Sequence, residues 1–444
     1  MRRRSTGIAA IILLIVFAMG CGETFRPIAT PIPQPGGDPS NLLHAIVVSQ
    51  NPGTPLPTTG CGTPAVAPCL GGASSIDTSG DSNVGNAVTG VTPVHAGFVS
   101  VTRTYVANLG NNTVTRILTQ APTSGSVTIP MPTGCGPRFV MSRNDGTAYI
   151  ACPDRDSAAA FDSVVVLSVP LDSITAEVQL PAGSNPVSLN EAFNGSKVYS
   201  LNSGNGTVSV IATVDNIVMK TITVGGSPTW SSMNQDGSLL FVANAGGYVS
   251  VIDTNADALA LPPVASVNVI AVGGNPTFVT FDANRRRLYV VNNAGNTISV
   301  IDAVATSSTF LSVIATIPVG ADPRSATALR NGAKVYVSSC GSNTVSVIDA
   351  TSLAVVKTIT TGTCPIGLTS PTDSSRVIVG VQGAGTGATA SDPPQILSIS
   401  TQTDAVLVTL KPPQQDPSCA INPTLLPPVT YCPLQQPVFV TMSP

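Results

Sequence analysis

A repeated unit dominates this sequence of 444 residues. Each copy contains a Gly-x-x-Pro turn, a short apolar run, a polar turn and a second run related to YVAN. A Gly/Asn-rich loop, a third run related to TVSVID, another polar turn and a last apolar run complete the copy. The second run recurs at intervals of 42 to 50 residues. The turn prolines are Pro93, Pro137, Pro186, Pro228, Pro276, Pro323 and Pro365.

The second and third runs have the composition of β-strands. The second run ends at Asn108, Cys152, Asn202, Asn244, Asn292, Ser339 and Val381. The third run is clearest as VSVID, at Val249–Asp253 and Val345–Asp349. These runs are short, rich in β-branched or aromatic residues, and bounded by Gly, Pro, Asn or Asp. No segment shows sustained helical periodicity, which disfavours a helical solenoid.

Four short strands in a unit of this length are typical of one blade of a β-propeller. A single blade leaves both of its faces exposed, whereas a ring of blades buries those faces and protects the strand edges. We therefore predict an all-β protein, a β-propeller built from four-stranded blades.

The two ends of the chain predict how the ring closes. Pro437–Thr441 (PVFVT) matches Pro276–Thr280 (PTFVT), the first strand of a unit, but only Met442 to Pro444 follow it. The missing strands occur near the N-terminus, at 44–49, 74–78 and 86–89. We expect the C-terminal strand to be the innermost strand of a blade whose other strands are N-terminal. Seven complete units and one shared unit predict eight blades, with seven as the alternative.

These runs resemble the YVTN-repeat β-propeller family, which is found in surface-layer and other exported proteins. The resemblance covers nearly the whole chain from about residue 39. It implies the propeller fold, and its more common seven-bladed form is the source of the seven-blade alternative. It implies little about function, because such propellers host many roles.

The first 20 residues predict an export signal. Three arginines at positions 2–4 precede Ile8–Met19, an apolar run of 12 residues that is short for a membrane span. Cys21 then resembles the lipidated cysteine of a bacterial lipobox, although the second and third residues before it depart from the usual pattern. A plain secretory signal is the alternative. Gly22 carries no inner-membrane retention signal, so the resemblance implies the outer membrane or the cell surface of a bacterium.

The expected organisation has three parts. Residues 1–20 are the signal peptide, and residues 21–38 contain the lipidated cysteine and a proline-rich linker. Prolines spaced through positions 27–35 predict a stiff, extended spacer. Residues 39–444 are expected to form a single β-propeller domain.

Composition excludes several functions. Lys plus Arg is 20 and Asp plus Glu is 23, so the formal net charge of −3 does not favour nucleic acid as a partner. The chain has only 2 His and lacks a Cys-x-x-Cys motif, which argues against zinc and haem sites. We expect no cofactor. Ca²⁺ is left open, although no motif indicates it.

Eight cysteines remain after Cys21, an even number that favours disulfides in an exported chain. Cys135 lies in a Gly-x-x-Pro turn and Cys152 ends the next second strand, so a hairpin brings them together. Cys340 follows a second strand, and Cys364 lies in the next Gly-x-x-Pro turn. All eight are expected on one face of the ring. The candidate pairs are Cys135–Cys152, Cys340–Cys364, Cys61–Cys69 and Cys419–Cys432, with crossed pairing among the last four as the alternative.

The innermost strands supply a candidate site at the centre of the ring. Two residues after each proline stand His95, Phe139, Ser188, Trp230, Phe278, Ser325, Gly367 and Phe439. Five of these eight carry rings, in a chain that is only 4% Phe, Trp and Tyr. These rings either line the mouth of a central channel or pack between blades. Arg138 and Arg324, one residue after their prolines, are candidates for binding an anion or for salt bridges with neighbouring loops.

No nucleophile elbow, phosphate-binding loop or zinc-protease motif occurs, and Glu is found at only three positions. The leading hypothesis is a monomeric, lipid-anchored propeller that binds or scaffolds through its cystine-bearing face. Its expected partners are the membrane, through the lipid anchor, and envelope proteins or surface glycans. The alternatives are a propeller enzyme with its site in the channel mouth, such as a metal-dependent hydrolase or lactonase, and a purely structural envelope protein.

Overall fold

A computed structural model describes residues 43–50, 70–100, 102–142, 146–153, 161–260, 269–384, 392–413 and 435–442. The chain divides into two units, Met1–Asn41 and Leu42–Pro444, and all described residues belong to the second. The predicted signal peptide, Cys21 and the linker lie outside the described residues. Within the described part, no helix is long and apolar enough to cross a membrane.

The second unit consists of eight antiparallel sheets, which we call blades 1 to 8. Blade 1 contains β33 (Gln436–Met442), β1 (His44–Gln50), β2 (Gly72–Asp77) and β3 (Ser82–Val88). Blade 2 contains β4 (Pro93–Ser100), β5 (Arg103–Asn108), β6 (Thr113–Leu118) and β7 (Val127–Pro130). Blade 3 contains β8 (Phe139–Met141), β9 (Thr147–Cys152), β10 (Phe161–Ser168) and β11 (Ser173–Pro181). Blade 4 contains β12 (Pro186–Glu191), β13 (Lys197–Asn202), β14 (Thr207–Ala212) and β15 (Ile217–Thr223).

The other four blades follow in chain order. Blade 5 contains β16 (Pro228–Met233), β17 (Leu239–Asn244), β18 (Tyr248–Asp253) and a split outer strand, β19 (Ala258–Leu259) and β20 (Val269–Ala271). Blade 6 contains β21 (Pro276–Asp282), β22 (Arg287–Asn292), β23 (Thr297–Asp302) and β24 (Val313–Pro318). Blade 7 contains β25 (Pro323–Ala328), β26 (Lys334–Ser339), β27 (Thr344–Asp349) and β28 (Ala354–Thr360). Blade 8 contains β29 (Pro365–Thr369), β30 (Arg376–Val381), β31 (Gln395–Ser400) and β32 (Ala405–Leu410).

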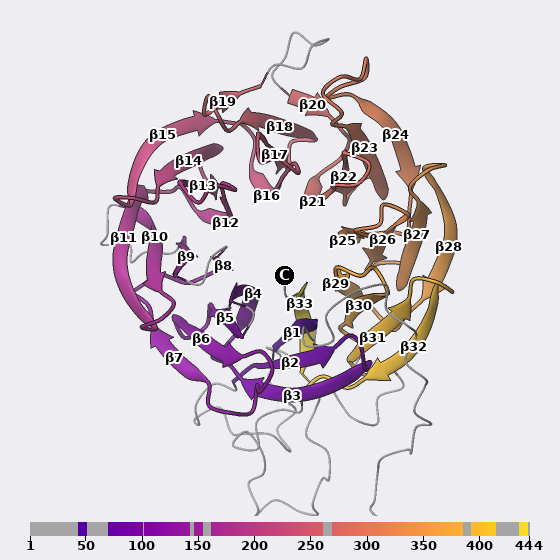
Figure 1. Cartoon of the computed structure of the whole chain (residues 1–444), viewed down its shortest axis with the longest axis horizontal. Coiled ribbons are helices and arrows are strands. Elements are labelled where there is room, and N and C mark those ends of the chain that lie inside the picture. The colour runs from indigo at the N-terminus through magenta and orange to yellow at the C-terminus, as the bar shows by residue number, and fades with distance from the viewer. Residues whose placement is uncertain are drawn as a thin grey trace, which may run out of the picture. The chain divides into compact units, whose positions relative to one another are not determined.

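The blades form a closed ring, with the first strand of each blade innermost (Figure 1). The prediction of eight blades is confirmed, and the seven-blade alternative is wrong. Closure is also as predicted, because β33 pairs antiparallel with β1, placing Val440 opposite Val47. Val47 and Val440 share a buried apolar cluster with Ile378 of blade 8, so the first and last blades are joined by a core as well as by a shared sheet.

The apolar core lies between neighbouring blades. Second strands are almost entirely buried, whereas the outer strands alternate between exposed and covered residues. The largest fully buried side chains include the ring that recurs at the start of the YVAN-type run: Tyr105, Tyr199, Tyr289, Tyr336 and Phe241. Each blade therefore contributes its second strand to a core shared with the next blade, as packing of one twisted sheet on another requires.

Several of these tyrosines form polar clamps between blades. Tyr199 Oη in blade 4 donates to Asp257 Oδ1 of blade 5 at 2.8 Å, and Lys197 Nζ lies 2.6 Å from Asp257 Oδ2. Asp257 stands in the turn after β18 at a φ of 49°, a left-handed conformation that Asp tolerates better than most residues. Burial, reinforced by the bond to Asp257, raises the pKa of Tyr199 well above its usual value, which keeps its hydroxyl a donor. The equivalent pairs are Tyr105–Asp172 and Tyr336–Asp404.

Two of the junctions without a Tyr–Asp pair show what replaces it. In blade 6, Tyr289 has the position of Tyr199, but Leu353 replaces the aspartate and packs beside it. The Tyr289 hydroxyl is buried with no acceptor for its proton among the described residues, and burial raises its pKa to about 12. In blade 5 both positions are apolar, because Phe241 shares a core cluster with Leu311. The clamp therefore depends on a matched pair of side chains contributed by two blades.

Candidate functional site: the disulfide face and the rings at the centre

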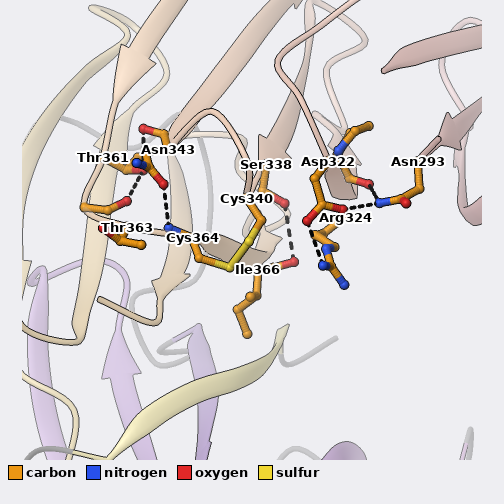
Figure 2. Close-up of a disulfide and its surroundings, with 12 residues drawn as sticks. Asn293, Asp322, Arg324, Ser338, Cys340, Asn343, Thr361, Thr363, Cys364 and Ile366 are labelled. Atoms are coloured by element: carbon orange, nitrogen blue, oxygen red, sulfur yellow. Dashed lines mark hydrogen bonds and ion pairs between the residues drawn. A yellow bond between two sulfur atoms is a disulfide. The ribbon is translucent and has the colours of Figure 1, made fainter. Parts of the chain in front are cut away.

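We call the side of the ring that bears the Gly-x-x-Pro turns and the loops between second and third strands the disulfide face. Both predicted disulfides within the described residues are present. Cys135–Cys152 links the turn before β8 to the end of β9, within blade 3. Cys340–Cys364 links the end of β26 in blade 7 to the turn that leads into blade 8 (Figure 2). Cys61, Cys69, Cys419 and Cys432 lie outside the described residues, so their pairing stays a prediction.

The disulfide between blades 7 and 8 occupies a position that hydrogen bonds fill elsewhere. Asn293 follows β22 as Cys340 follows β26, and Asp322 precedes its proline as Cys364 does. Asn293 Nδ2 donates to the Asp322 carboxylate and, at 3.1 Å, to the Pro323 carbonyl (Figure 2). At the junction of blades 1 and 2, Gln50, the last residue of β1, donates in the same way to the Pro93 carbonyl, at 2.7 Å. The disulfide thus covalently locks one instance of a recurring junction.

The two candidate anion-binding arginines lie far apart in the ring. Arg324 donates to Asp322 Oδ2 at 2.7 Å, and its side chain is 52% exposed. Burial opposes ionisation of Asp322, but hydrogen bonds from Arg324 and Asn293 outweigh it and hold the pKa of that carboxyl below its usual value. Arg138 is half-buried, and its backbone N–H donates to the Ala151 carbonyl at 3.1 Å. Because blades 3 and 7 are on opposite sides of the ring, the structure does not bring the two guanidinium groups into one site.

The innermost strands carry a bulge directly after the turn proline. In blade 5, Pro228 pairs with Asn244 and Trp230 pairs with Ala243, so Thr229 is skipped in the ladder. The same shift occurs in the other blades whose proline lies in the paired strand. A bulge of this kind changes the direction of the next side chain. It therefore sets the direction of the residue two positions after each proline.

Five of these side chains meet at the centre as one cluster of rings, which we call the axial rings: His95, Phe139, Trp230, Phe278 and Phe439. Trp230 is their hub, with ring centroids 4.9 Å from Phe278 and 5.4 Å from Phe139. It also lies 6.2 Å from His95 and 6.4 Å from Phe439, which come from the opposite part of the ring. His95 stacks on Phe139 at 3.9 Å. The rings thus pack against one another across the centre of the ring.

Small residues complement the axial rings. Blades 4, 7 and 8 supply Ser188, Ser325 and Gly367 at the same position. Because blade 4 contributes only Ser188, the indole of Trp230 in blade 5 can contact Phe139 of blade 3. The mixture of large and small side chains lets rings from five blades meet at the centre, where His95 and Phe139 are buried and the other three rings are partly exposed.

His95 is neutral within this cluster. Its Nδ1 accepts a hydrogen bond from the Val140 backbone N–H at 3.3 Å, so the proton of the neutral ring is on Nε2. Burial lowers the pKa of His95 to about 3. The axial rings therefore carry no charge in the physiological range of pH.

Acid should weaken the fold through His95. The unfolded side chain binds a proton below a pKa of about 6.5 and the folded one only near 3, so stability is lost as pH falls through this window. Unfolding by urea should cost about 2 kcal/mol less at pH 5 than at pH 7. In His95→Phe the loss of stability between pH 7 and pH 5 should be smaller by about this amount, because the contribution of His44, whose pKa burial also lowers, is the same in both proteins. An equal pH dependence in the two proteins would contradict a neutral, buried His95.

The asparagines of the YVAN-type run hold the hairpin between second and third strands. Asn202 Nδ2 donates to Thr207 Oγ1 at 3.0 Å and to Ser209 Oγ at 2.9 Å. The partners of Asn202 Nδ2 are thus hydroxyls of the facing strand. Residues at alternate positions of an antiparallel partner lie on the same face, which places both hydroxyls within reach. Equivalent bonds to hydroxyls are made by Asn108, Asn244 and Asn292.

Sequence reasoning missed two sets of residues. It did not identify the inter-blade clamps, although an aspartate such as Asp172, Asp257 or Asp404 in the last turn of the next blade was a visible signal. It also missed the Asn293–Asp322 bond, although these two residues stand at the same positions of the repeat as the predicted pair Cys340 and Cys364. Among the described residues, no group of three or more His, Cys, Asp or Glu side chains is placed to hold a metal ion.

Comparison with known proteins confirms the architecture. No protein-family model and no curated protein sequence matches the chain. Among solved structures, the dihydro-heme d1 dehydrogenase NirN in complex with DHE has a TM-score of 0.64 at 12% identity, covering 94% of this chain and 78% of that one. The chain is a β-propeller.

Two further solved structures have the same arrangement. A Bacteroides fragilis protein provisionally named a 6-phosphogluconolactonase gives a TM-score of 0.53 at 12% identity, covering 92% of this chain and all of that one. A protein of unknown function from Desulfotomaculum acetoxidans gives 0.52 at 16% identity, covering 71% and 94%. At these identities the likeness establishes the fold of the propeller and leaves its function open.

Proposed function

We propose that the protein is an exported, lipid-anchored propeller that binds a partner through its disulfide face. The observation that carries the proposal is the covalent bond between blades 7 and 8, since Cys340–Cys364 locks a junction that ordinary hydrogen bonds fill elsewhere in the ring. Disulfides persist in oxidising compartments outside the cytoplasm. A second disulfide on the same face, Cys135–Cys152, adds to its rigidity.

The chemistry of this face suits a macromolecular partner. Arg324 and Asp322 form an exposed ion pair beside the disulfide, which is a polar contact of the kind found at interface rims (Figure 2). A pre-organised surface loses little conformational entropy on binding, and the disulfide provides that rigidity. Lipid anchoring at Cys21 would place this surface at the bacterial envelope, where envelope proteins and surface glycans are the available partners.

The competing enzyme hypothesis places a metal-dependent site in the channel mouth. Among the described residues, the side chains that converge at the centre are the axial rings, and these offer packing surface and no carboxylate. This observation favours a binding or scaffold role over hydrolysis.

One experiment tests the anchor and the binding face together. The full chain is produced in a bacterial host, and the mass of the mature N-terminal peptide is measured. A diacylglyceryl group on Cys21 is expected, and a mature form without Cys21 would contradict the anchor. Anchored protein is then cross-linked in intact cells and captured, using the unaltered chain, Arg324→Ala, and Arg330→Ala as a control on the opposite face.

Partner recovery should fall about five-fold in Arg324→Ala, because a rim contact typically contributes about 1 kcal/mol. Recovery should be unchanged in Arg330→Ala. Equal recovery from all three proteins, or loss only in the control, would contradict binding through the disulfide face.

A further inference from the structure

A cavity of about 440 Å³ lies on the face opposite the disulfides, where blades 4 and 5 meet. Its walls are the turn between β12 and β13, the turn between β16 and β17, and the turn after β18. These strands belong to neighbouring sheets of the ring (Figure 1). The volume is within the range of about 300–1,000 Å³ that small-molecule sites occupy.

An aromatic ring forms one wall of this cavity. Phe193 is 44% exposed, which is unusual for a large apolar side chain in this ring of buried aromatics. It packs over Gly237, whose φ of 71° and missing side chain make room for it, since a Cβ there would lie 2.9 Å from Phe193 Cγ. The phenyl ring is therefore held in place by the neighbouring blade and still presents surface to solvent.

Polar groups with unused hydrogen-bonding capacity stand around this ring. Asn194 Oδ1 accepts from the Ser196 backbone and hydroxyl, which leaves its Nδ2 without a partner among the described residues. The exposed Asn255 side chain likewise makes no hydrogen bond within the described part of the chain, although its backbone N–H donates to Asp253. The cavity thus offers the amide donor of Asn194 and the amide of Asn255, which can both donate and accept.

A carboxylate completes the wall, and the floor is neutral. Both hydrogen bonds from Ser238 go to Asp236 Oδ1, which leaves Oδ2 as an acceptor. These bonds hold the pKa of Asp236 below its usual value, so it is ionised. Lys197 at the floor is neutralised by Asp257 at 2.6 Å. The net charge of the lining therefore disfavours anionic ligands.

We propose that this cavity binds a neutral sugar ring, with one apolar face of the sugar stacked on Phe193 and its hydroxyls bonded to Asn194, Asn255 and Asp236. Carbohydrates combine a C–H face with hydroxyls that both donate and accept, and the cavity offers an aromatic face, two amides and a carboxylate acceptor. This pairing of apolar platform and convergent polar groups is the general pattern of small-ligand sites. The site is independent of the disulfide face.

The junction of blades 7 and 8 provides a natural comparison. It has the same clamp, with Lys334 and Tyr336 bonded to Asp404. Its turn also has an asparagine, Asn331, at the position of Asn194, but Arg330 replaces the phenylalanine. The aromatic platform is therefore a feature of the junction of blades 4 and 5 and not of the clamp itself.

Saturation-transfer NMR with the folded full chain tests the proposal, using the methyl glycosides of glucose, galactose, mannose and N-acetylglucosamine, with glucuronate as the charged comparison. At least one neutral glycoside should receive saturation. Phe193→Ala should weaken its binding at least ten-fold and Asn255→Ala about three-fold. Arg330→Ala, at the matched position of the other junction, should leave it unchanged.

Thermal unfolding of each variant tests whether the protein is folded. If Phe193→Ala is not folded, Asn255→Ala takes its place as the test of the site. Absence of saturation with all four neutral glycosides would overturn the proposal, as would stronger binding of glucuronate. Undiminished binding in both site variants would also overturn it. Arg324→Ala, on the disulfide face, should bind the sugar normally, so failure here and failure of the proposed envelope function are distinguishable.

Discussion

Trp230→Ala should destabilise the propeller by about 3 kcal/mol, the lower end of the range for Trp→Ala, because Trp230 is partly exposed. Trp230 is the hub of the axial rings, with four other rings within 6.4 Å. Its removal leaves a cavity that blade 4 cannot fill, because Ser188 occupies the corresponding position there. The neighbouring rings are fixed by bulged strands, so the space can collapse only in part. The free energy of unfolding in urea, measured by circular dichroism, checks this value.

Trp230→Phe is the matched control, since it keeps a ring at the same place. It should cost about 1.5 kcal/mol, because part of the volume is retained. Trp230 is the only tryptophan of the chain, so its fluorescence in the unaltered protein reports unfolding of the centre directly. A loss below about 1 kcal/mol in Trp230→Ala would show that the axial rings contribute little to holding the blades together.

Asp257→Ala should destabilise the protein by about 3 kcal/mol, because it removes the carboxylate that pairs with a partly buried cation and leaves Tyr199 with only the longer bond to the Thr254 carbonyl, at 3.3 Å. Lys197 and Tyr199 of blade 4 both bond this carboxylate, whose side chain is 11% exposed. The value is at the lower end of the range for breaking a buried pair, since Lys197 is 20% exposed and keeps a bond to the Thr254 carbonyl.

Tyr289→Phe is the informative counterpart, because it removes a hydroxyl that has no acceptor for its proton among the described residues. This variant should change stability by less than about 0.5 kcal/mol, or increase it, since an unsatisfied buried hydroxyl is itself unfavourable. Tyr199→Phe, at the same position of another blade, should cost about 1 kcal/mol. Equal losses of stability in the two tyrosine variants would show that the contribution of the hydroxyl to stability does not depend on the aspartate.

Much of the architecture is encoded locally. The eight blades, the closure by β33 and the pairs Cys135–Cys152 and Cys340–Cys364 all follow from residues with fixed positions in a repeated unit. A repeat places equivalent residues at equivalent points of each blade, so one disulfide pattern predicts the next. Local turn chemistry is equally accessible, as with Asp253, whose carboxylate accepts the backbone N–H of Asn255.

The sites formed by different blades could not be read from the repeat. Whether Trp230 lines an open mouth or fills the centre depends on the directions of His95 and Phe439, which come from the other side of the ring. Those directions are set by a bulge after each proline, a feature of strand pairing that sequence periodicity does not reveal. The sequence likewise names Arg138 and Arg324 as candidates for anion binding or salt bridges, and it does not reveal that the ring places them on opposite sides.

The sequence by itself therefore predicted eight blades, the closure of the ring and the face that carries the disulfides, because each of these depends on the order and spacing of motifs along the repeated chain. Only the tertiary structure decided which side chains meet at the centre, which tyrosines find an aspartate in the next blade, and that Phe193 and Asn255 border one cavity. The physical reason is that these contacts join residues of different blades. The distances between such residues are set by the packing of the blades and cannot be read from the local sequence.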